Sequence, residues 1–206
     1  MRVPPEKAEP VELYAMYYLM LTLGLRRGEA LGLRWQDVDL GEGRLRVRQS
    51  LSPQGQGGGY VIKQVKTSSS RRTLYLRDDL VSVLRAHKAR QDEQKKLLRS
   101  DWQEIDLVFT TAIGTPVSPR NALRGFKALL KGLKVTPIRI HDLRHTHASL
   151  MLKQRVPVEV VSERLGHSRV SITIDLYRHL YDAERQAAAL DMSELLGPAE
   201  EPRVAN

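Results

Sequence analysis

The chain has 206 residues, 41% of them hydrophobic, so it can bury a core and disorder is excluded as its default state. Its 33 Lys and Arg residues outnumber its 24 Asp and Glu residues, and the net charge of +9 favours a polyanionic partner, either nucleic acid or an anionic membrane surface. Because the chain has no cysteine, thiol catalysis, disulfide bonds and cysteine-bound zinc are excluded.

The longest apolar run, residues 13–25, is too short to span a bilayer, and the first residues lack the pattern of a signal peptide. We therefore expect a soluble cytoplasmic protein with no membrane partner. Within this run a core helix is predicted from Glu12 to Leu23, closed by Gly24. A second helix, from Gly28 to about Trp35, would place Arg26 in the tight connection between the two.

From Gly43 the spacing of apolar residues changes to two, which indicates β-strands with one buried face. Two further runs, residues 60–66 and 71–76, are predicted to form a hairpin with Lys66 just before its tip. Basic residues on such strands are ordinarily a solvated face, but with the overall positive charge they could equally follow a nucleic-acid backbone. The candidate DNA-binding residues are Arg44, Arg46, Arg48, Lys63 and Arg71.

Residues 55–59 are rich in glycine, which raises the question of a phosphate-binding loop. The loop is not followed by Gly-Lys-Ser/Thr, and Val65 stands before Lys66 where the glycine of that motif belongs. No nucleotide partner is therefore predicted, and we interpret the segment as a flexible hairpin connection.

The rest of the chain has a helical pattern. The predicted helical stretches are residues 79–99, a helix after 118–119, residues 141–154 and 157–166, a stretch carrying Tyr177, and residues 182–196. The fold class predicted is α+β, mainly α-helical with a small three-stranded antiparallel sheet. We expect a single domain over residues 1–196 and a flexible tail at 197–206, where Gly and Pro end the helical pattern.

The sequence His-Asp-Leu-Arg-His-Thr-His at residues 141–147 is the densest group of chemically active side chains. Helical spacing puts His141, Arg144 and His145 on one face, where Arg and His together suit a phosphate clamp. A metal site on His141 and His145 is an alternative, but no third ligand is evident and Arg144 would be repelled by a dication. The histidines could also simply cap or pack the helix.

This cluster contains one of five separated motifs in the chain. They are Leu23-Gly24-Leu25-Arg26-Arg27-Gly28-Glu29, Lys66 in its hairpin, His141-x-x-Arg144, Leu165-Gly166-His167, and Tyr177 ten residues later. In order and spacing they resemble the catalytic domain of the tyrosine recombinases, the phage integrase family, over residues 10–181. The segment from Glu29 to Asp39 also looks like this family. Five motifs in the right order are far more specific than any one of them.

The resemblance implies a site-specific recombinase or integrase that cleaves and rejoins double-stranded DNA through a covalent 3′-phosphotyrosine, without metal or other cofactor. It implies that Arg26, Arg144, His141 and His167 hold the scissile phosphate, Lys66 protonates the leaving 5′ oxygen, Glu29 supports the arrangement and Tyr177 is the nucleophile. Further copies of the chain would join in a synaptic tetramer on DNA, in the nucleoid.

Some positions leave alternatives open. Tyr181, one turn beyond Tyr177, is a second candidate nucleophile, and Lys63 is a lesser alternative to Lys66 that strand alternation places on the opposite face. Members of the family usually carry a further helical domain in front of the catalytic one. Because so few residues precede the first predicted helix, we expect this N-terminal core-binding domain to be absent.

The chemistry of the residues supports these roles independently. Attack on a phosphodiester adds negative charge to the nonbridging oxygens, so guanidinium and imidazole donors stabilise the transition state more than the ground state. A phenol, with an ordinary pKa near ~10, needs help to lose its proton, and His167 is a candidate for that help. The rival functions are a type IB topoisomerase, a non-catalytic DNA-binding module of the same fold, and a metal-dependent hydrolase built on His141 and His145.

Overall fold

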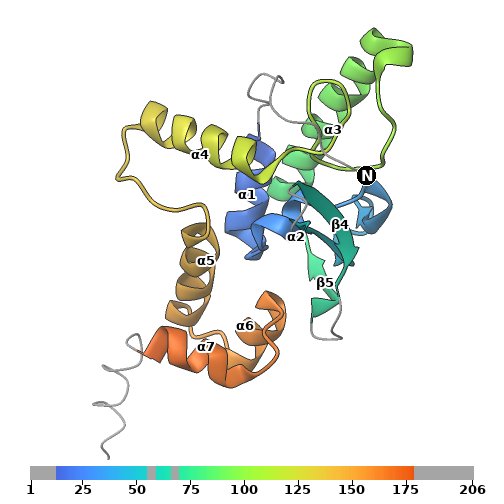
Figure 1. Ribbon diagram of the computed structural model, residues 1–206. Coiled ribbons are helices and arrows are strands. Elements are labelled where there is room, and N and C mark those ends of the chain that lie inside the picture. Colours follow the sequence, from blue (N-terminus) through green and yellow to red (C-terminus); the bar gives the residue numbers. More distant parts are fainter. Residues whose placement is uncertain (1–12, 55–58, 66–69, 179–206) are drawn as a thin grey trace, which may run out of the picture.

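The computed structural model describes residues 13–54, 59–65 and 70–178, which form an α+β fold that is mainly helical (Figure 1). Lys66, Tyr181 and the stretch 182–206, for which a helix and a tail are predicted, lie outside the described residues. The helices are α1 Tyr14–Leu23, α2 Arg27–Leu31, η1 Trp35–Asp37, α3 Asp78–Leu98, η3 Arg99–Asp101, α4 Pro119–Leu133, α5 Asp142–Lys153, α6 Val158–Leu165 and α7 Val170–Tyr177. The strands are β1 Val38–Asp39, β2 Arg44–Val47, β3 Gln49–Pro53, β4 Tyr60–Gln64 and β5 Arg72–Tyr75.

The strands form two small antiparallel sheets, β1-β2-β5 and β3-β4. A three-stranded antiparallel sheet is thus confirmed, but the predicted hairpin between residues 60–66 and 71–76 is wrong. Strand β4 pairs with β3, where Leu51 faces Ile62, and β5 pairs with β2, where Leu45 faces Leu74. The glycine-rich loop joins β3 to β4, so its interpretation as a hairpin connection is confirmed. Alternation indicates which face of a strand is buried and does not identify its partner.

Helix α1 lies at the centre of the main core, as its apolar sequence predicts. Met16, Leu19 and Met20 have no exposed surface, and the Tyr17 hydroxyl donates a 2.8 Å hydrogen bond to the carbonyl of Ala122 in α4. Burying apolar side chains over so broad a face of a helix is possible only where several other elements pack against it. Helices α2, α3 and α5 supply those contacts.

Gly24 ends α1 as predicted, with φ +68° and its N–H donating to the carbonyl of Met20. This left-handed conformation is one that residues with a Cβ adopt rarely. A Cβ here would also come within 2.7 Å of the His147 ring and 2.8 Å of Leu165. Gly24 therefore lets α5 and α6 approach the end of α1, and this brings the distant motifs together.

Helix α2 is shorter than predicted and ends at Leu31, before η1 begins at Trp35. Its Gly28 lies directly against β3, where an added Cβ would be 2.6 Å from the carbonyl oxygen of Leu51. Helices α5, α6 and α7 gather at one end of the molecule around a second apolar cluster (Figure 1). That cluster consists of Ala148, Leu152, Val161, Leu165 and Tyr177.

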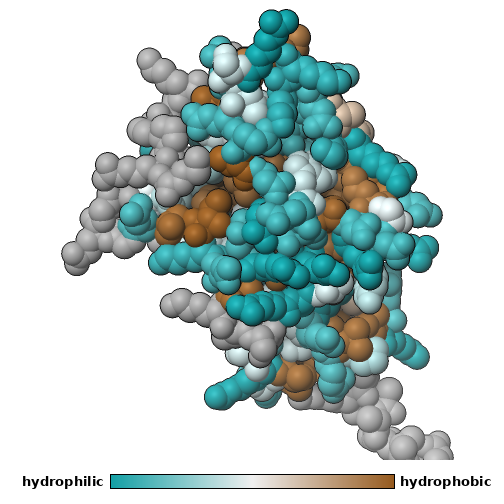
Figure 2. Space-filling model, turned by 90° about the vertical axis from the view of Figure 1, so that its right-hand side faces the viewer, coloured by the Kyte–Doolittle hydropathy of each residue, from teal (hydrophilic) through white to brown (hydrophobic). Residues whose placement is uncertain are grey.

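None of the described helices is long and apolar enough to cross a membrane. The side of the molecule on which β4 and β5 lie in Figure 1 faces the viewer in Figure 2, where hydrophilic residues cover most of the surface and apolar residues form separate patches. This agrees with a chain in which 28% of the residues are charged.

Candidate active site

A pocket of about 360 Å³ brings together four of the predicted catalytic residues. Arg26 comes from the corner between α1 and α2, His141 and Arg144 come from the start of α5, and His167 comes from the connection between α6 and α7. The remaining lining residues are Ser70, Gly166, Ser168 and Ile172. Residues up to 141 positions apart in the sequence (26 to 167) therefore share one cavity.

Arg26 precedes α2 in an extended conformation and is oriented by Glu29. Its backbone N–H donates to Glu29 Oε2 at 2.8 Å, and its Nη1 donates to Glu29 Oε1 at 2.9 Å. Its Nη2 donates to the carbonyl of Gly166 at 3.1 Å. The side chain remains 40% exposed, so the guanidinium is fixed in direction but still open to the pocket.

Arg144 is held in a different way, because it is buried and hydrogen-bonded to main-chain carbonyls. Its Nη1 and Nη2 each donate a 2.6 Å bond, to Gly24 and Leu165 respectively. Among the described residues it has no carboxylate within ion-pair distance. Burial, together with the nearby positive charges of Arg26 and Arg72, lowers the pKa of Arg144 to about 9, so it is still charged at neutral pH. A buried cation that makes no direct ion pair favours the binding of an anion.

The counterion of the site is Glu29, only 3% exposed, and its main partner is Arg72 of β5. Arg72 donates through Nη1 to Oε1 at 3.0 Å and through Nη2 to Oε2 at 2.8 Å. Burial alone would raise the pKa of Glu29, but hydrogen bonding to Arg72 and the charges of Arg72 and Arg26 bring it below its usual value. The carboxylate is thus ionised and fully hydrogen-bonded.

Arg72 was missed by the sequence analysis, which selected its neighbour Arg71. A signal was present, because Arg72 alternates with Leu74 and so belongs to the buried face of β5. An arginine pointing inward needs a buried acceptor, and Glu29 is the buried acid that provides it.

His167 is fixed by a 2.8 Å hydrogen bond between its Nδ1 and the hydroxyl of the buried Thr173. Burial and the charges of Arg144, Arg26 and Arg72 lower the pKa of His167 to about 4. Burial, followed by the neighbouring His145 and Arg144, also lowers the pKa of His141. The imidazoles in the pocket are therefore neutral hydrogen-bonding groups at neutral pH.

Tyr177, the last residue of α7, is 3% exposed and packs in the second apolar cluster. Burial raises its pKa, and the charge of Arg144 partly opposes this effect. The side chain at its hydroxyl is His145, whose Nδ1 is 2.9 Å away, and not His167, a candidate from the sequence for helping the phenol to lose its proton. His145 had been considered only as part of the 141–147 cluster, including as a metal ligand. In the described part of the chain, no three His, Asp or Glu side chains converge as a metal site.

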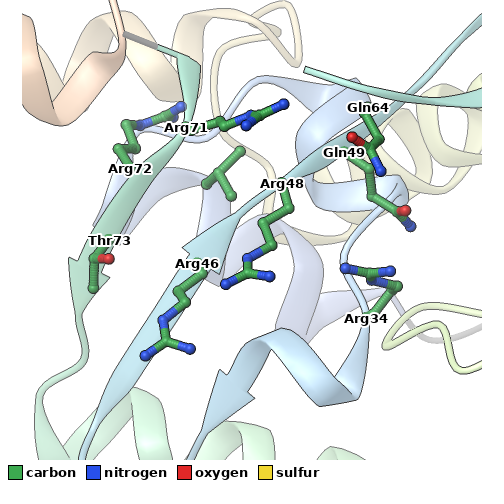
Figure 3. Close-up of a pocket in the computed structure, with 9 residues that line it drawn as sticks. Arg34, Arg46, Arg48, Gln49, Gln64, Arg71, Arg72 and Thr73 are labelled. Atoms are coloured by element: carbon green, nitrogen blue, oxygen red, sulfur yellow. The ribbon is translucent and has the colours of Figure 1, made fainter. Parts of the chain in front are cut away.

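A second, larger cavity of about 520 Å³ is lined by residues of strands β2, β3, β4 and β5, and arginine side chains from several segments converge on it (Figure 3). Asp37 orients two of them, accepting from Arg34 Nε at 2.6 Å and pairing with Arg48 Nε at 3.5 Å. Arg46 and Arg71 have no ion-pair partner among the described residues. The lining residues are Arg34, Arg46, Val47, Arg48, Gln49, Gln64, Arg71, Arg72 and Thr73.

The predicted DNA-binding residues are therefore divided by the structure. Arg46, Arg48 and Arg71 line this arginine cavity, whereas Lys63 does not. Arg44 also lies outside it, and pairs with Asp39 at 3.4 Å. Arg34, which the sequence analysis did not select, completes the cavity.

Comparison with known proteins gives one consistent result. The model of the phage integrase family matches residues 1–184. A tyrosine recombinase XerC-like protein of Caldanaerobacter subterraneus subsp. tengcongensis is 34% identical, and the match covers 89% of this chain and 49% of that protein. The ICEBs1 integrase of Bacillus subtilis (strain 168) is 32% identical, and the match covers 89% of this chain and 50% of that protein. The chain thus spans about half the length of these relatives.

Solved structures share the fold. The integrase of transposon Tn1549, in complex with circular intermediate DNA, superimposes with a TM-score of 0.71 at 20% identity, covering 90% of this chain and 60% of that one. XerA recombinase gives a TM-score of 0.62 at 24% identity, and the match covers 90% of this chain and 57% of that one. The predicted fold class is thereby confirmed.

Proposed function

The chain belongs to the phage integrase family, and from this premise we propose that it is a site-specific DNA recombinase that acts through a covalent 3′-phosphotyrosine. The observation that carries the proposal is the convergence of Arg26, His141, Arg144 and His167 on one pocket, next to the helix that ends in Tyr177. Relatives named recombinase, integrase and transposase favour strand exchange over the relaxation activity of a topoisomerase.

The pocket is suited to a phosphodiester that gains charge during reaction. Arg26 and Arg144 each use part of their guanidinium to bind fixed acceptors, and each has five N–H donors in all. The remaining donors can bind the nonbridging oxygens of the scissile phosphate. Because these donors are already oriented, they stabilise the transition state without reorganisation. His141 and His167 add neutral donors from the same cavity.

In the proposed reaction the Tyr177 oxygen bonds to phosphorus and the bond from phosphorus to the 5′ oxygen breaks. The phenol proton passes to a neutral imidazole of the site, and the 5′ oxygen takes a proton from a general acid, for which Lys66 is the proposed residue. The phosphotyrosine ester keeps the energy of the broken bond. A second 5′-hydroxyl can therefore reverse the step and reseal a different strand, with no nucleotide consumed.

Double-stranded DNA is the proposed partner, and the arginine cavity is the proposed contact with its backbone. Five arginines line this cavity. The acidic partners that the described residues give them are Asp37 and, for Arg72, Glu29, so the cavity keeps an excess of positive charge. Phosphate contacts of this kind position a protein on DNA without reading its sequence. Further copies of the chain would assemble on the same DNA to exchange strands.

The test is capture of the covalent intermediate. The protein is incubated with supercoiled plasmid in EDTA, quenched with detergent, and examined for protein joined to DNA, with Tyr177→Phe and Tyr181→Phe in parallel. We expect an adduct with the wild type and with Tyr181→Phe and none with Tyr177→Phe. An adduct that persists in Tyr177→Phe, or a wild type that binds the plasmid without forming one, would contradict the proposal.

A further inference from the structure

We propose that His145 is the positioning residue of the Tyr177 nucleophile, and that its Nδ1 sets the direction of the phenolic hydroxyl through a hydrogen bond. The inference rests on the proposed function, since it concerns the same tyrosine. It adds a residue that belongs to neither the phosphate pocket nor the set of predicted catalytic residues.

The contact joins two helices. His145 lies in α5, one residue after Arg144, and Tyr177 ends α7. The Nδ1 atom is 2.9 Å from the phenolic oxygen, and the two ring centroids are 6.0 Å apart. On its other side the His145 ring meets the ring of His141 edge to face, at 4.9 Å between centroids. His145 is therefore held between a residue of the phosphate pocket and the nucleophile.

The surroundings of Tyr177 make this bond decisive for its orientation. The ring packs with Ala148, Leu152, Val161 and Leu165, which offer no polar side-chain atom. A buried hydroxyl without a partner is costly, and His145 is the hydrogen-bond partner that the described residues supply. Without it the O–H would turn toward another acceptor or toward water, and the lone pairs of the phenolic oxygen would no longer be held in one direction.

The direction of the bond matters for the chemistry. When the imidazole proton is on Nε2, Nδ1 accepts a hydrogen bond from the phenolic hydroxyl. The O–H vector then points to His145, and the oxygen lone pairs are left free for phosphorus. Arg144 acts on the same oxygen through its charge, and His167 is bonded to Thr173 instead. Neither therefore duplicates the role of His145.

The first experiment compares three substitutions of His145 in the adduct assay under single-turnover conditions with saturating protein. Asn carries a polar atom as many bonds from Cα as Nδ1, whereas Gln places it one bond further. We expect His145→Ala and His145→Gln to slow adduct formation by roughly tenfold, the equivalent of one neutral hydrogen bond. His145→Asn should recover most of the rate, and all three should bind a labelled duplex as tightly as the wild type.

Thr146→Ala is the matched control, because Thr146 is the exposed neighbour on the same helix. It should react at the wild-type rate. A His145→Ala protein that reacts at the wild-type rate or faster would overturn the proposal, as would a His145→Asn protein as slow as His145→Ala. Melting temperatures establish that each variant is folded.

The second experiment does not need catalysis. The ¹⁵N resonances of the imidazoles are recorded for the wild type and for Tyr177→Phe. We expect Nδ1 of His145 to shift when the hydroxyl is removed, while His147, whose Nε2 accepts from Arg164 at 3.2 Å, stays unchanged. A His145 resonance that does not move would refute the contact. If the wild type formed no adduct, the proposed function would fail, and this measurement would still decide whether His145 holds Tyr177.

Discussion

The guanidinium of Arg72 holds the carboxylate of Glu29 by two parallel hydrogen bonds, of 3.0 and 2.8 Å, in the interior beneath the pocket. The same carboxylate accepts from the backbone and the side chain of Arg26. Arg72 also donates through Nε to the carbonyl of Arg164 at 2.7 Å, so it joins β5 to α2 and to α6. A single buried acid thus orients one arginine that faces the pocket and one that does not.

Replacing Arg72 by Ala should destabilise the fold, because it leaves Glu29 buried with part of its charge unpaired. Loss of one partner of a buried ion pair costs roughly 3–5 kcal/mol. The adjacent Arg71→Ala is the control, because Arg71 is exposed, and it should change the free energy of unfolding by no more than about 0.5 kcal/mol. Urea unfolding measures both. Equal effects of the two substitutions would show that the Glu29–Arg72 pair does not support the fold.

Replacing either arginine of the proposed phosphate clamp should slow adduct formation. Loss of one donor that stabilises transition-state charge typically costs roughly 10²–10³ in rate, and we expect this for Arg26→Ala and for Arg144→Ala. Arg90→Ala, an exposed arginine of α3, is the control and should react normally. Single-turnover adduct formation at saturating DNA is the measurement. Near-normal rates for Arg26→Ala in a folded protein would remove Arg26 from the clamp.

Features set by local sequence could be predicted, and the structure shows why. Helix α1 follows from an unbroken apolar run, and its end follows from Gly24, whose backbone takes the left-handed conformation. The resemblance of the five motifs to the tyrosine recombinases implied that Arg26, His141, Arg144 and His167 act together before any geometry was known. These four residues do share a pocket.

Features set by packing between distant segments could not be predicted. The partners of β4 and β5 depend on how the sheets assemble, which alternation does not encode. The choice between His145 and His167 as the neighbour of Tyr177 depends on how α7 packs against α5 and α6. The arginine cavity likewise needs Asp37, from a short 3-10 helix, to orient Arg34 and Arg48.

Binding to DNA should depend steeply on salt, with the arginine cavity responsible for part of the slope. Each phosphate contact that is removed lowers the slope of log Kd against log salt by about one. We expect that reduction for Arg46→Ala, because Arg46 has no ion pair among the described residues, and Arg90→Ala should leave the slope unchanged. Fluorescence anisotropy of a labelled duplex over a range of salt concentrations measures it. An unchanged slope for Arg46→Ala would place the DNA elsewhere.

Stability should fall as the pH is lowered from neutrality, because buried histidines resist protonation. Burial and the charge of Arg164 lower the pKa of His147 from 6.5 to about 4, and His167 is lowered to a similar value. Between about pH 4 and pH 6.5 these histidines bind more protons in the unfolded chain than in the folded chain, so their contribution makes the free energy of unfolding rise with pH over this range. His147→Gln, which cannot take the proton, should flatten this dependence. Urea unfolding at pH 5 and pH 7 is the test, and an unchanged pH dependence in His147→Gln would contradict it.

The proposed role of Lys66 as the general acid can be separated from a role in binding by changing the leaving group. A 5′ alkoxide is a strong base and needs a proton as it departs, whereas a thiolate leaves without one. Lys66→Ala should therefore form the adduct slowly on ordinary DNA and at close to the wild-type rate on DNA with a 5′-bridging phosphorothiolate. Lys63→Ala is the control, because Lys63 is exposed on β4 and lies outside the arginine cavity. It should behave as the wild type on both substrates. If the sulfur substrate does not rescue Lys66→Ala although the variant still binds DNA, the proton comes from another residue.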